Sequence, residues 1–109
     1  MRVEVRIHRI AEEQLQEWLF SQDPANQYRD ALVREYYDEL VRALTRWKGE
    51  IPNAECMRSA EPRIYRWKYS EELWVEFVVK RTTRLFGQFE SRKIIVTAFE
   101  PVSETEDDS

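Results

Sequence analysis

Two runs of aromatic and β-branched residues, separated by a short polar turn, constrain the fold of this chain more than any other feature. They cover residues 63–69 (RIYRWKY) and 73–81 (LWVEFVVKR), with residues 70–72 between them. Such runs favour β-strands, and the short connection favours an antiparallel hairpin. Side chains alternate between the two faces of a strand, so Arg66 and Lys68 share one face and the aromatic residues of the first run share the other. The hairpin therefore predicts a sheet with a basic face and an aromatic face.

The N-terminal half predicts one strand followed by a pair of helices. Apolar and polar residues alternate over residues 2–8, which is typical of a strand with one buried face. The apolar spacing becomes helical over residues 11–22, and we expect a second helix over residues 24–48 with Asp23 as its N-terminal cap. One apolar stripe follows this second helix and is expected to be buried; it consists of Tyr28, Leu32, Tyr36, Leu40, Ala43, Leu44 and Trp47. Gly49 is expected to end the helix.

The C-terminal half predicts the rest of the sheet. Residues 49–62 contain two prolines and no hydrophobic period, so we expect a loop there, and residues 82–91 are expected to form a turn. The continuous apolar run within residues 92–99 indicates a strand in the interior of the sheet, buried on both faces. Residues 102–109 are acidic and are expected to be a disordered tail. We therefore expect a single α+β domain over residues 1–101, with an N-terminal strand, an αα-hairpin and three antiparallel strands that carry the helices on one face.

Charge is distributed unevenly along the chain. The net charge is −4, yet residues 63–93 hold eight basic and four acidic side chains, so the sheet half offers a surface for an anionic partner. The only cysteine is Cys56, which leaves no intrachain disulfide and favours a reducing compartment. No apolar run is long enough to cross a bilayer, and we expect a cytoplasmic protein without a membrane partner. With His8 as the only histidine and no glycine-rich phosphate loop, we expect neither a metal site nor a cofactor.

The order strand, helix, helix and three antiparallel strands, with Arg66 and Lys68 alternating on the second strand, resembles the RelE/ParE superfamily of bacterial toxins. The resemblance covers residues 1 to about 100. It implies an antitoxin protein as partner and one of two activities. RelE-like members cut messenger RNA on the ribosome without a metal, by attack of the ribose 2′-hydroxyl on the adjacent phosphate. ParE-like members instead poison DNA gyrase.

Cleavage by a 2′-hydroxyl requires a group that takes its proton and cations that stabilise the charge growing on the phosphate. The resemblance makes Arg66 and Lys68 the candidate catalytic cations. Glu76 is the candidate for proton transfer, with Tyr69 or His8 as alternatives. The expected nucleic-acid contacts are Arg66, Lys68, Arg81, Arg84 and Arg92.

A second function class stays open beside the toxin hypothesis. The resemblance implies a basic residue and a His or Tyr after the last strand, where this chain has Phe99, Glu100 and Pro101. The lack of an acid–base pair there favours a small binding module without catalysis. Such a module would use its basic and aromatic sheet to hold a protein or a nucleic acid.

Overall fold

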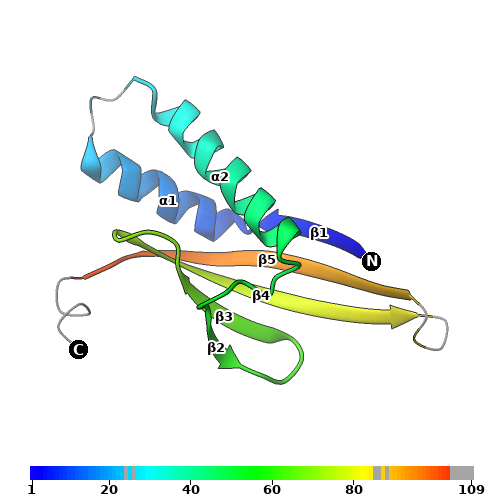
Figure 1. The fold of residues 1–109 in the computed structure, drawn as a ribbon. Coiled ribbons are helices and arrows are strands. Elements are labelled where there is room, and N and C mark those ends of the chain that lie inside the picture. Colours follow the sequence, from blue (N-terminus) through cyan, green and yellow to red (C-terminus); the bar gives the residue numbers. More distant parts are fainter. Residues whose placement is uncertain (24, 26, 85–86, 88, 104–109) are drawn as a thin grey trace.

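The protein is described by a computed structural model for residues 1–23, 25, 27–84, 87 and 89–103. Within these residues the strands are β1 (Arg2–Ile7), β2 (Glu55–Arg58), β3 (Arg63–Lys68), β4 (Leu73–Arg84) and β5 (Phe89–Pro101), and the helices are α1 (Arg9–Gln22) and α2 (Arg29–Arg46) (Figure 1). The two helices follow β1 directly, and the other four strands come after them. Of residues 102–109, for which we expect a disordered tail, residues 104–109 lie outside the described part of the chain. The N–H of Val102 donates to the backbone oxygen of Glu72 at 2.9 Å.

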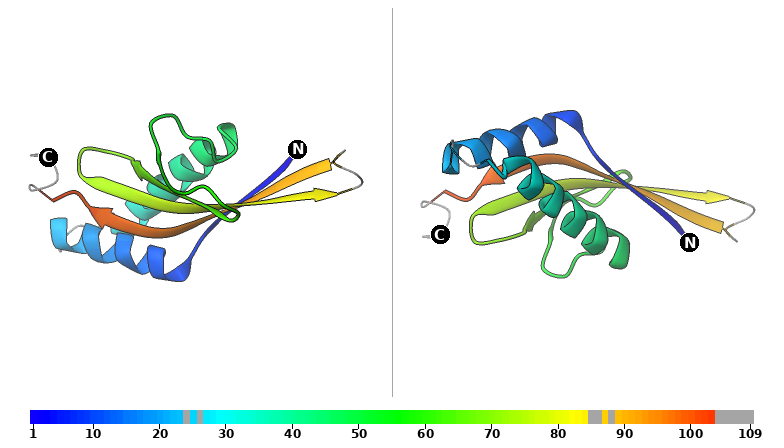
Figure 2. Two further views of the ribbon diagram at one scale, coloured as in Figure 1. Left: turned by 90° about the horizontal axis from the view of Figure 1, so that it is seen from below. Right: turned by 90° about the horizontal axis from the view of Figure 1, so that it is seen from above.

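The sheet is mixed, with the strand order β1-β5-β4-β3-β2. β1 runs parallel to β5, and every other neighbouring pair is antiparallel. Both helices lie on the same side of this sheet (Figures 1 and 2). The expected α+β class is therefore confirmed. The interior position predicted for the last strand is also confirmed, because β5 lies between β1 and β4.

The core forms between the helices and the sheet face that they cover. Alternate residues of β4 and β5 point to this face, and the buried set in these strands is Leu73, Val75, Phe77, Val79, Ile94, Val96 and Phe99. Removing such apolar surface from water is the main favourable contribution to folding. Tyr65 and Trp67 pack against the same core, as the alternation in the first run predicts. The prediction that β5 is buried on both faces is wrong, because Ile95 on the opposite face is only half-buried.

The end of α2 depends on Gly49, as predicted. Its backbone N–H donates to the carbonyl oxygen of Leu44 at 3.0 Å, and its φ is +79°. A Cβ at this position would lie 2.8 Å from Cγ2 of Val79, so a side chain would collide with the core. Glycine alone combines the left-handed backbone with the missing Cβ, which lets the chain leave the helix against the sheet.

The predicted start of the second helix is wrong, and so is the predicted burial of the residues at its two ends. Asp23 closes α1 and accepts a hydrogen bond from the N–H of Ala25 at 3.2 Å, and α2 begins only at Arg29. The outer members of the predicted stripe, Tyr28 and Trp47, lie at the caps of α2 and are 65% and 45% exposed. The side chain turns with the backbone at a helix end, so helical spacing does not predict burial there. Replacing Trp47 will accordingly cost less than removal of a buried aromatic side chain.

Within the described residues the sheet is larger than expected, with five strands instead of four. Residues 55–58, assigned to a loop, form the edge strand β2, whose residues are all exposed and therefore lack hydrophobic alternation. Residues 82–84 and 89–91, assigned to a turn, extend β4 and β5 into a long ribbon. Figure 1 shows this ribbon running beyond the ends of the helices. Strands without a covered face do not need apolar residues, which is why their sequences are typical of loops.

Candidate nucleic-acid interface on the open sheet face

The face of the sheet opposite the helices, here called the open face, carries the candidate catalytic residues. In the register of β3 and β4, Arg66 lies directly opposite Glu76, and Lys68 lies opposite Trp74. Side chains of directly opposite residues point to the same side of the sheet. Arg66 and Lys68 are two residues apart on β3, about 7 Å. The structure therefore brings Arg66, Lys68 and Glu76 together on one surface.

Both cations on β3 interact with neighbouring groups. The guanidinium of Arg66 lies 4.1 Å from the ring centroid of Trp74, and its Nη2 lies 3.2 Å from Oε2 of Glu100. Nζ of Lys68 lies 3.7 Å from Oε2 of Glu71. The sequence analysis did not identify Trp74 or Glu100 as part of this site. Their proximity depends on strand register, and Glu100 lies 34 residues from Arg66 in the chain.

Glu76 lies beside a β-bulge. The register of β4 with β5 shifts after Glu76, whose partner is Ala98, because Phe77 pairs with Val96 and leaves Thr97 as an extra residue. The hydroxyl Oγ1 of Thr97 lies 3.2 Å from the backbone oxygen of Glu76 and 3.1 Å from its Oε1. The contact with Thr97 orients the carboxylate of Glu76. A carboxylate can accept several hydrogen bonds, so Glu76 can still accept one from another donor.

The two alternative residues for proton transfer are placed elsewhere. Nδ1 of His8 accepts a hydrogen bond from the N–H of Ile10 at 3.1 Å, which makes His8 the N-terminal cap of α1. Tyr69 packs against the core on the helix side, where its hydroxyl donates to the carboxylate of Glu39. Burial, followed by the interaction with Glu39, raises the pKa of the Tyr69 phenol. Neither residue joins Arg66 on the open face.

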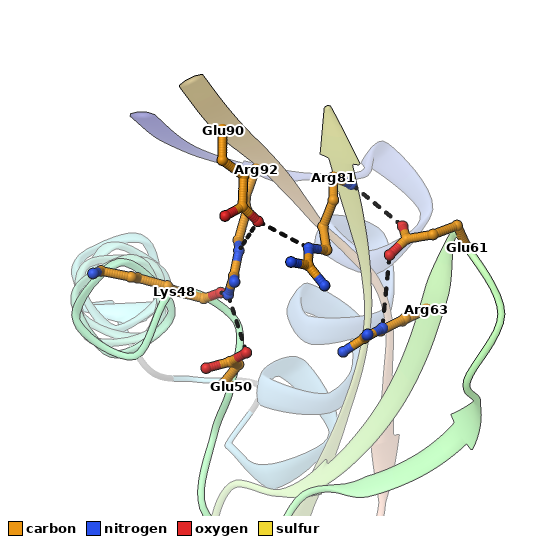
Figure 3. A network of polar contacts seen from close by, with 7 residues as sticks. All are labelled: Lys48, Glu50, Glu61, Arg63, Arg81, Glu90 and Arg92. Atoms are coloured by element: carbon orange, nitrogen blue, oxygen red, sulfur yellow. Dashed lines mark hydrogen bonds and ion pairs between the residues drawn. The ribbon is translucent and has the colours of Figure 1, made fainter. Parts of the chain in front are cut away.

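Two of the expected nucleic-acid contacts, Arg81 and Arg92, lie on the helix side of the ribbon (Figure 3). Arg92 is 8% exposed; its Nη1 donates to the backbone oxygen of Lys48 at 2.9 Å, and its Nε donates to Oε1 of Glu90 at 3.1 Å. Nε of Arg81 donates to the same carboxylate oxygen at 2.8 Å. These hydrogen bonds, from Arg81 first and then Arg92, lower the pKa of Glu90. The network attaches the loop after α2 to the ribbon, so the structure does not place Arg81 and Arg92 beside Arg66.

The remaining expected contact, Arg84, is exposed on the open face but lies far from Arg66. It follows Glu76, the partner of Arg66, by eight residues, or about 26 Å along an extended strand. Of the five expected contacts, only Arg66 and Lys68 are therefore close neighbours on the same surface.

Three further observations bear on function. Among the described residues, no group of three His, Cys, Asp or Glu side chains is placed to hold a metal ion. In the same part of the chain, neither helix is long and apolar enough to cross a membrane. Comparisons with protein-family models, with curated proteins and with solved structures found no match to this chain. The function is therefore inferred from the chemistry of the surface itself.

Proposed function

We propose that the protein is a RelE/ParE-like toxin that binds RNA on the open face of its sheet and cleaves it without a metal ion. The observation that carries this proposal is the position of Arg66 opposite Glu76, with Lys68 on the same face. Two cations beside a carboxylate provide the groups that 2′-hydroxyl attack requires. The order of elements, with one strand and two helices before an antiparallel set of strands, supports it.

In the proposed reaction Glu76 takes the proton of a ribose 2′-hydroxyl. The 2′ oxygen forms a bond to the adjacent phosphorus, and the bond from phosphorus to the 5′ oxygen of the next nucleotide breaks. The products are a 2′,3′-cyclic phosphate and a 5′-hydroxyl group. Arg66 stabilises the charge on the phosphate, and Lys68 does the same and provides a proton for the leaving 5′ oxygen.

The ion pairs already present on this surface are compatible with such a ligand. The partners of Arg66 and Lys68, Glu100 and Glu71, have side chains that are 61% and 95% exposed. Exposed ion pairs of this kind contribute about 0–1 kcal/mol. A phosphate can therefore replace either carboxylate at small cost, while Trp74 keeps the guanidinium of Arg66 in place.

The test combines growth and cleavage assays. Arg66→Ala with Lys68→Ala should relieve growth arrest in cells and abolish cleavage of messenger RNA on translating ribosomes. Glu76→Gln should abolish cleavage while keeping RNA binding. Cleavage by the wild-type protein should persist in the presence of EDTA. Arg34→Ala with Arg42→Ala is the matched control, because it removes two exposed positive charges from α2 and leaves the open face intact.

A second candidate function is the binding module without catalysis. It is favoured by the ion pairs that Arg66 forms with Glu100 and Lys68 forms with Glu71. In that case the wild-type protein cuts no RNA, but the Arg66→Ala and Lys68→Ala variant still loses its partner. Growth arrest without RNA cleavage would indicate a protein target, as in ParE-like toxins. A wild-type protein that causes neither arrest nor cleavage contradicts the toxin proposal.

A further inference from the structure

A second basic region lies on the open face, at the end of the ribbon that runs beyond the helices (Figure 1). Three neighbouring strands contribute to it, because Arg2 of β1 lies opposite Ser91 of β5, which lies opposite Thr82 of β4. One step along, Lys93 lies opposite Lys80. We call this region the distal patch; it consists of Arg2, Lys80, Thr82, Arg84, Ser91 and Lys93.

The positive charges of the distal patch outnumber the acids beside them in the described part of the chain. In the part of the chain that the structure describes, none of its four cations has an ion-pair partner within 4.0 Å. Two acids lie near them in the described chain. Glu4, directly opposite Lys93, is paired with Arg6 at 2.7 Å, and Glu90 is paired with Arg81 and Arg92. Arg6 is also the main cause of the lowered pKa of Glu4, to which Lys93 and Arg2 add smaller contributions. The region therefore keeps an excess of positive charge.

Stability of the fold explains only part of this arrangement, because Glu4 of β1 lies directly opposite Lys93 and such opposite-charge pairs are favourable. Lys80 and Lys93 are directly opposite each other, and like charges in that position destabilise a sheet. Lysine on an edge strand can prevent aggregation, which suits Lys80 beyond the last residue that pairs with β3. Lys93 lies on β5, which is paired with β1 on one side and with β4 on the other, so this reason does not apply to it. A cluster of four cations with one acid opposite points to a ligand of opposite charge.

The shape of the region suits a chain of phosphates. Two adjoining hollows, with volumes of about 230 and 470 Å³, share Arg2, Arg84 and Ser91 in their walls. Thr82 and Lys93 line the smaller one together with Glu4, and Glu90 lies in the wall of the larger one. Arginine binds phosphate with two parallel hydrogen bonds, and serine and threonine hydroxyls are common donors to the phosphates of nucleic acids. The combination is typical of contacts to a nucleic-acid backbone rather than to a single apolar molecule.

We propose that the distal patch is a second RNA site, which holds the phosphodiester backbone of the strand whose reactive nucleotide lies at Arg66 and Lys68. Lys80 and Arg84 follow the position of Arg66 by about 13 and 26 Å along β4. The patch supplies affinity and orientation and takes no part in the chemistry. The identity of the ligand as RNA rests on the proposed function, whereas the affinity of the patch for phosphates rests on its own charges.

The experiment measures binding of a fluorescein-labelled single-stranded RNA of mixed sequence by anisotropy, over a range of salt concentrations. Each phosphate contact contributes about 0.7 to the magnitude of the slope when the logarithm of the binding constant is plotted against the logarithm of the salt concentration. At 0.1 M salt, the loss of one contact therefore lowers the affinity about 5-fold. Lys80→Gln with Lys93→Gln should therefore lower affinity about 25-fold and reduce the slope by about 1.4. The variant with Arg34→Ala and Arg42→Ala should bind like the wild type.

The outcomes separate this inference from the proposed function. Equal affinity and equal slope in the Lys80→Gln and Lys93→Gln variant and the wild type overturn the inference. A fall in melting temperature that parallels the loss of binding also overturns it, because the patch would then be structural. If this variant loses binding but the wild type cleaves no RNA, the distal site stands and the ribonuclease proposal fails. Tighter binding of a labelled duplex DNA through the same lysines overturns the assignment of RNA.

Discussion

The two basic regions of the open face differ in what lies behind them and in what surrounds their charges. Arg66 lies where the sheet is backed by the helices, and an acid and an aromatic ring already contact it. The distal patch lies on the ribbon, and within the described residues its Lys80 and Lys93 form no ion pair within 4.0 Å, although Glu4 lies opposite Lys93. In the described chain the same sheet therefore carries one basic region whose cations form ion pairs and another whose cations do not.

The two basic regions also differ in the contacts on the helix side of the sheet behind them. Behind Arg66 lies the apolar core with Phe77 at its centre, whereas the ribbon is held to the loop after α2 by the hydrogen bonds of Arg92 and Glu90 (Figure 3). A core stabilises a sheet by burial, while an ionic network does so through directional contacts that leave the other face free. The sheet behind the distal patch is therefore held by polar contacts, and the sheet behind Arg66 is held by apolar packing.

The largest loss of stability is expected from a substitution in the core behind Arg66. Phe77→Ala should lower the free energy of unfolding by about 3–5 kcal/mol, because Phe77 is fully buried and its removal leaves a cavity. Urea denaturation followed by circular dichroism measures this loss. The control is Val78→Ala, which truncates the neighbouring residue on the half-buried open face and should cost clearly less. Equal losses in the two variants would show that the open face is packed as tightly as the helix side.

A smaller loss is expected from the network behind the distal patch. Arg92→Ala should lower the free energy of unfolding by about 1–3 kcal/mol, since it leaves the backbone oxygen of Lys48 without its donor. Arg84→Ala, on the exposed side of the same ribbon, should change it by less than about 0.5 kcal/mol. Both values come from the same denaturation experiment. If Arg92→Ala is neutral, the ribbon is held by something other than this network.

The network should also make the stability of the protein depend on acidic pH. The folded-state pKa of Glu90 lies below its ordinary value of 4.5, because Arg81 and Arg92 donate hydrogen bonds to the carboxylate. Its contribution is therefore present above about pH 4.5 and is lost as the pH falls through the folded-state pKa. Thermal melts of the wild type and of Glu90→Gln over this range test the expectation. An identical acid-induced loss in the variant would assign the effect to other carboxylates.

The smallest effect, and one of opposite sign, is expected in the distal patch itself. Lys80→Gln removes the charge that faces Lys93 and should raise the free energy of unfolding by about 0.2–1 kcal/mol. The corresponding change Lys68→Gln removes the ion pair with Glu71 and should give no such gain. The comparison is made from melting temperatures at low salt. A loss of stability in Lys80→Gln would show that the positive charge has a structural role.

Local sequence patterns predicted much of the fold and little of the site. The alternation over residues 63–69 placed Arg66 and Lys68 opposite the aromatic side chains, because a strand has a period of two whatever it pairs with. The helical spacing likewise predicted the buried middle of α2, where Leu40 and Leu44 are fully buried. It failed for Trp47 at the helix end, and it gave no signal for the exposed strand β2.

The sequence by itself determined the two helices, the aromatic and basic faces of the hairpin and the excess of positive charge in the sheet half. Only the tertiary structure decided which charges meet. Arg66 lies beside Glu100, and Arg92 reaches the backbone of Lys48, across 34 and 44 residues of the chain. Local propensities act over a few neighbouring residues, whereas strand register and the packing of helices on the sheet bring together residues that no local pattern connects. For that reason the four cations of the distal patch became recognisable as one surface only in the folded protein.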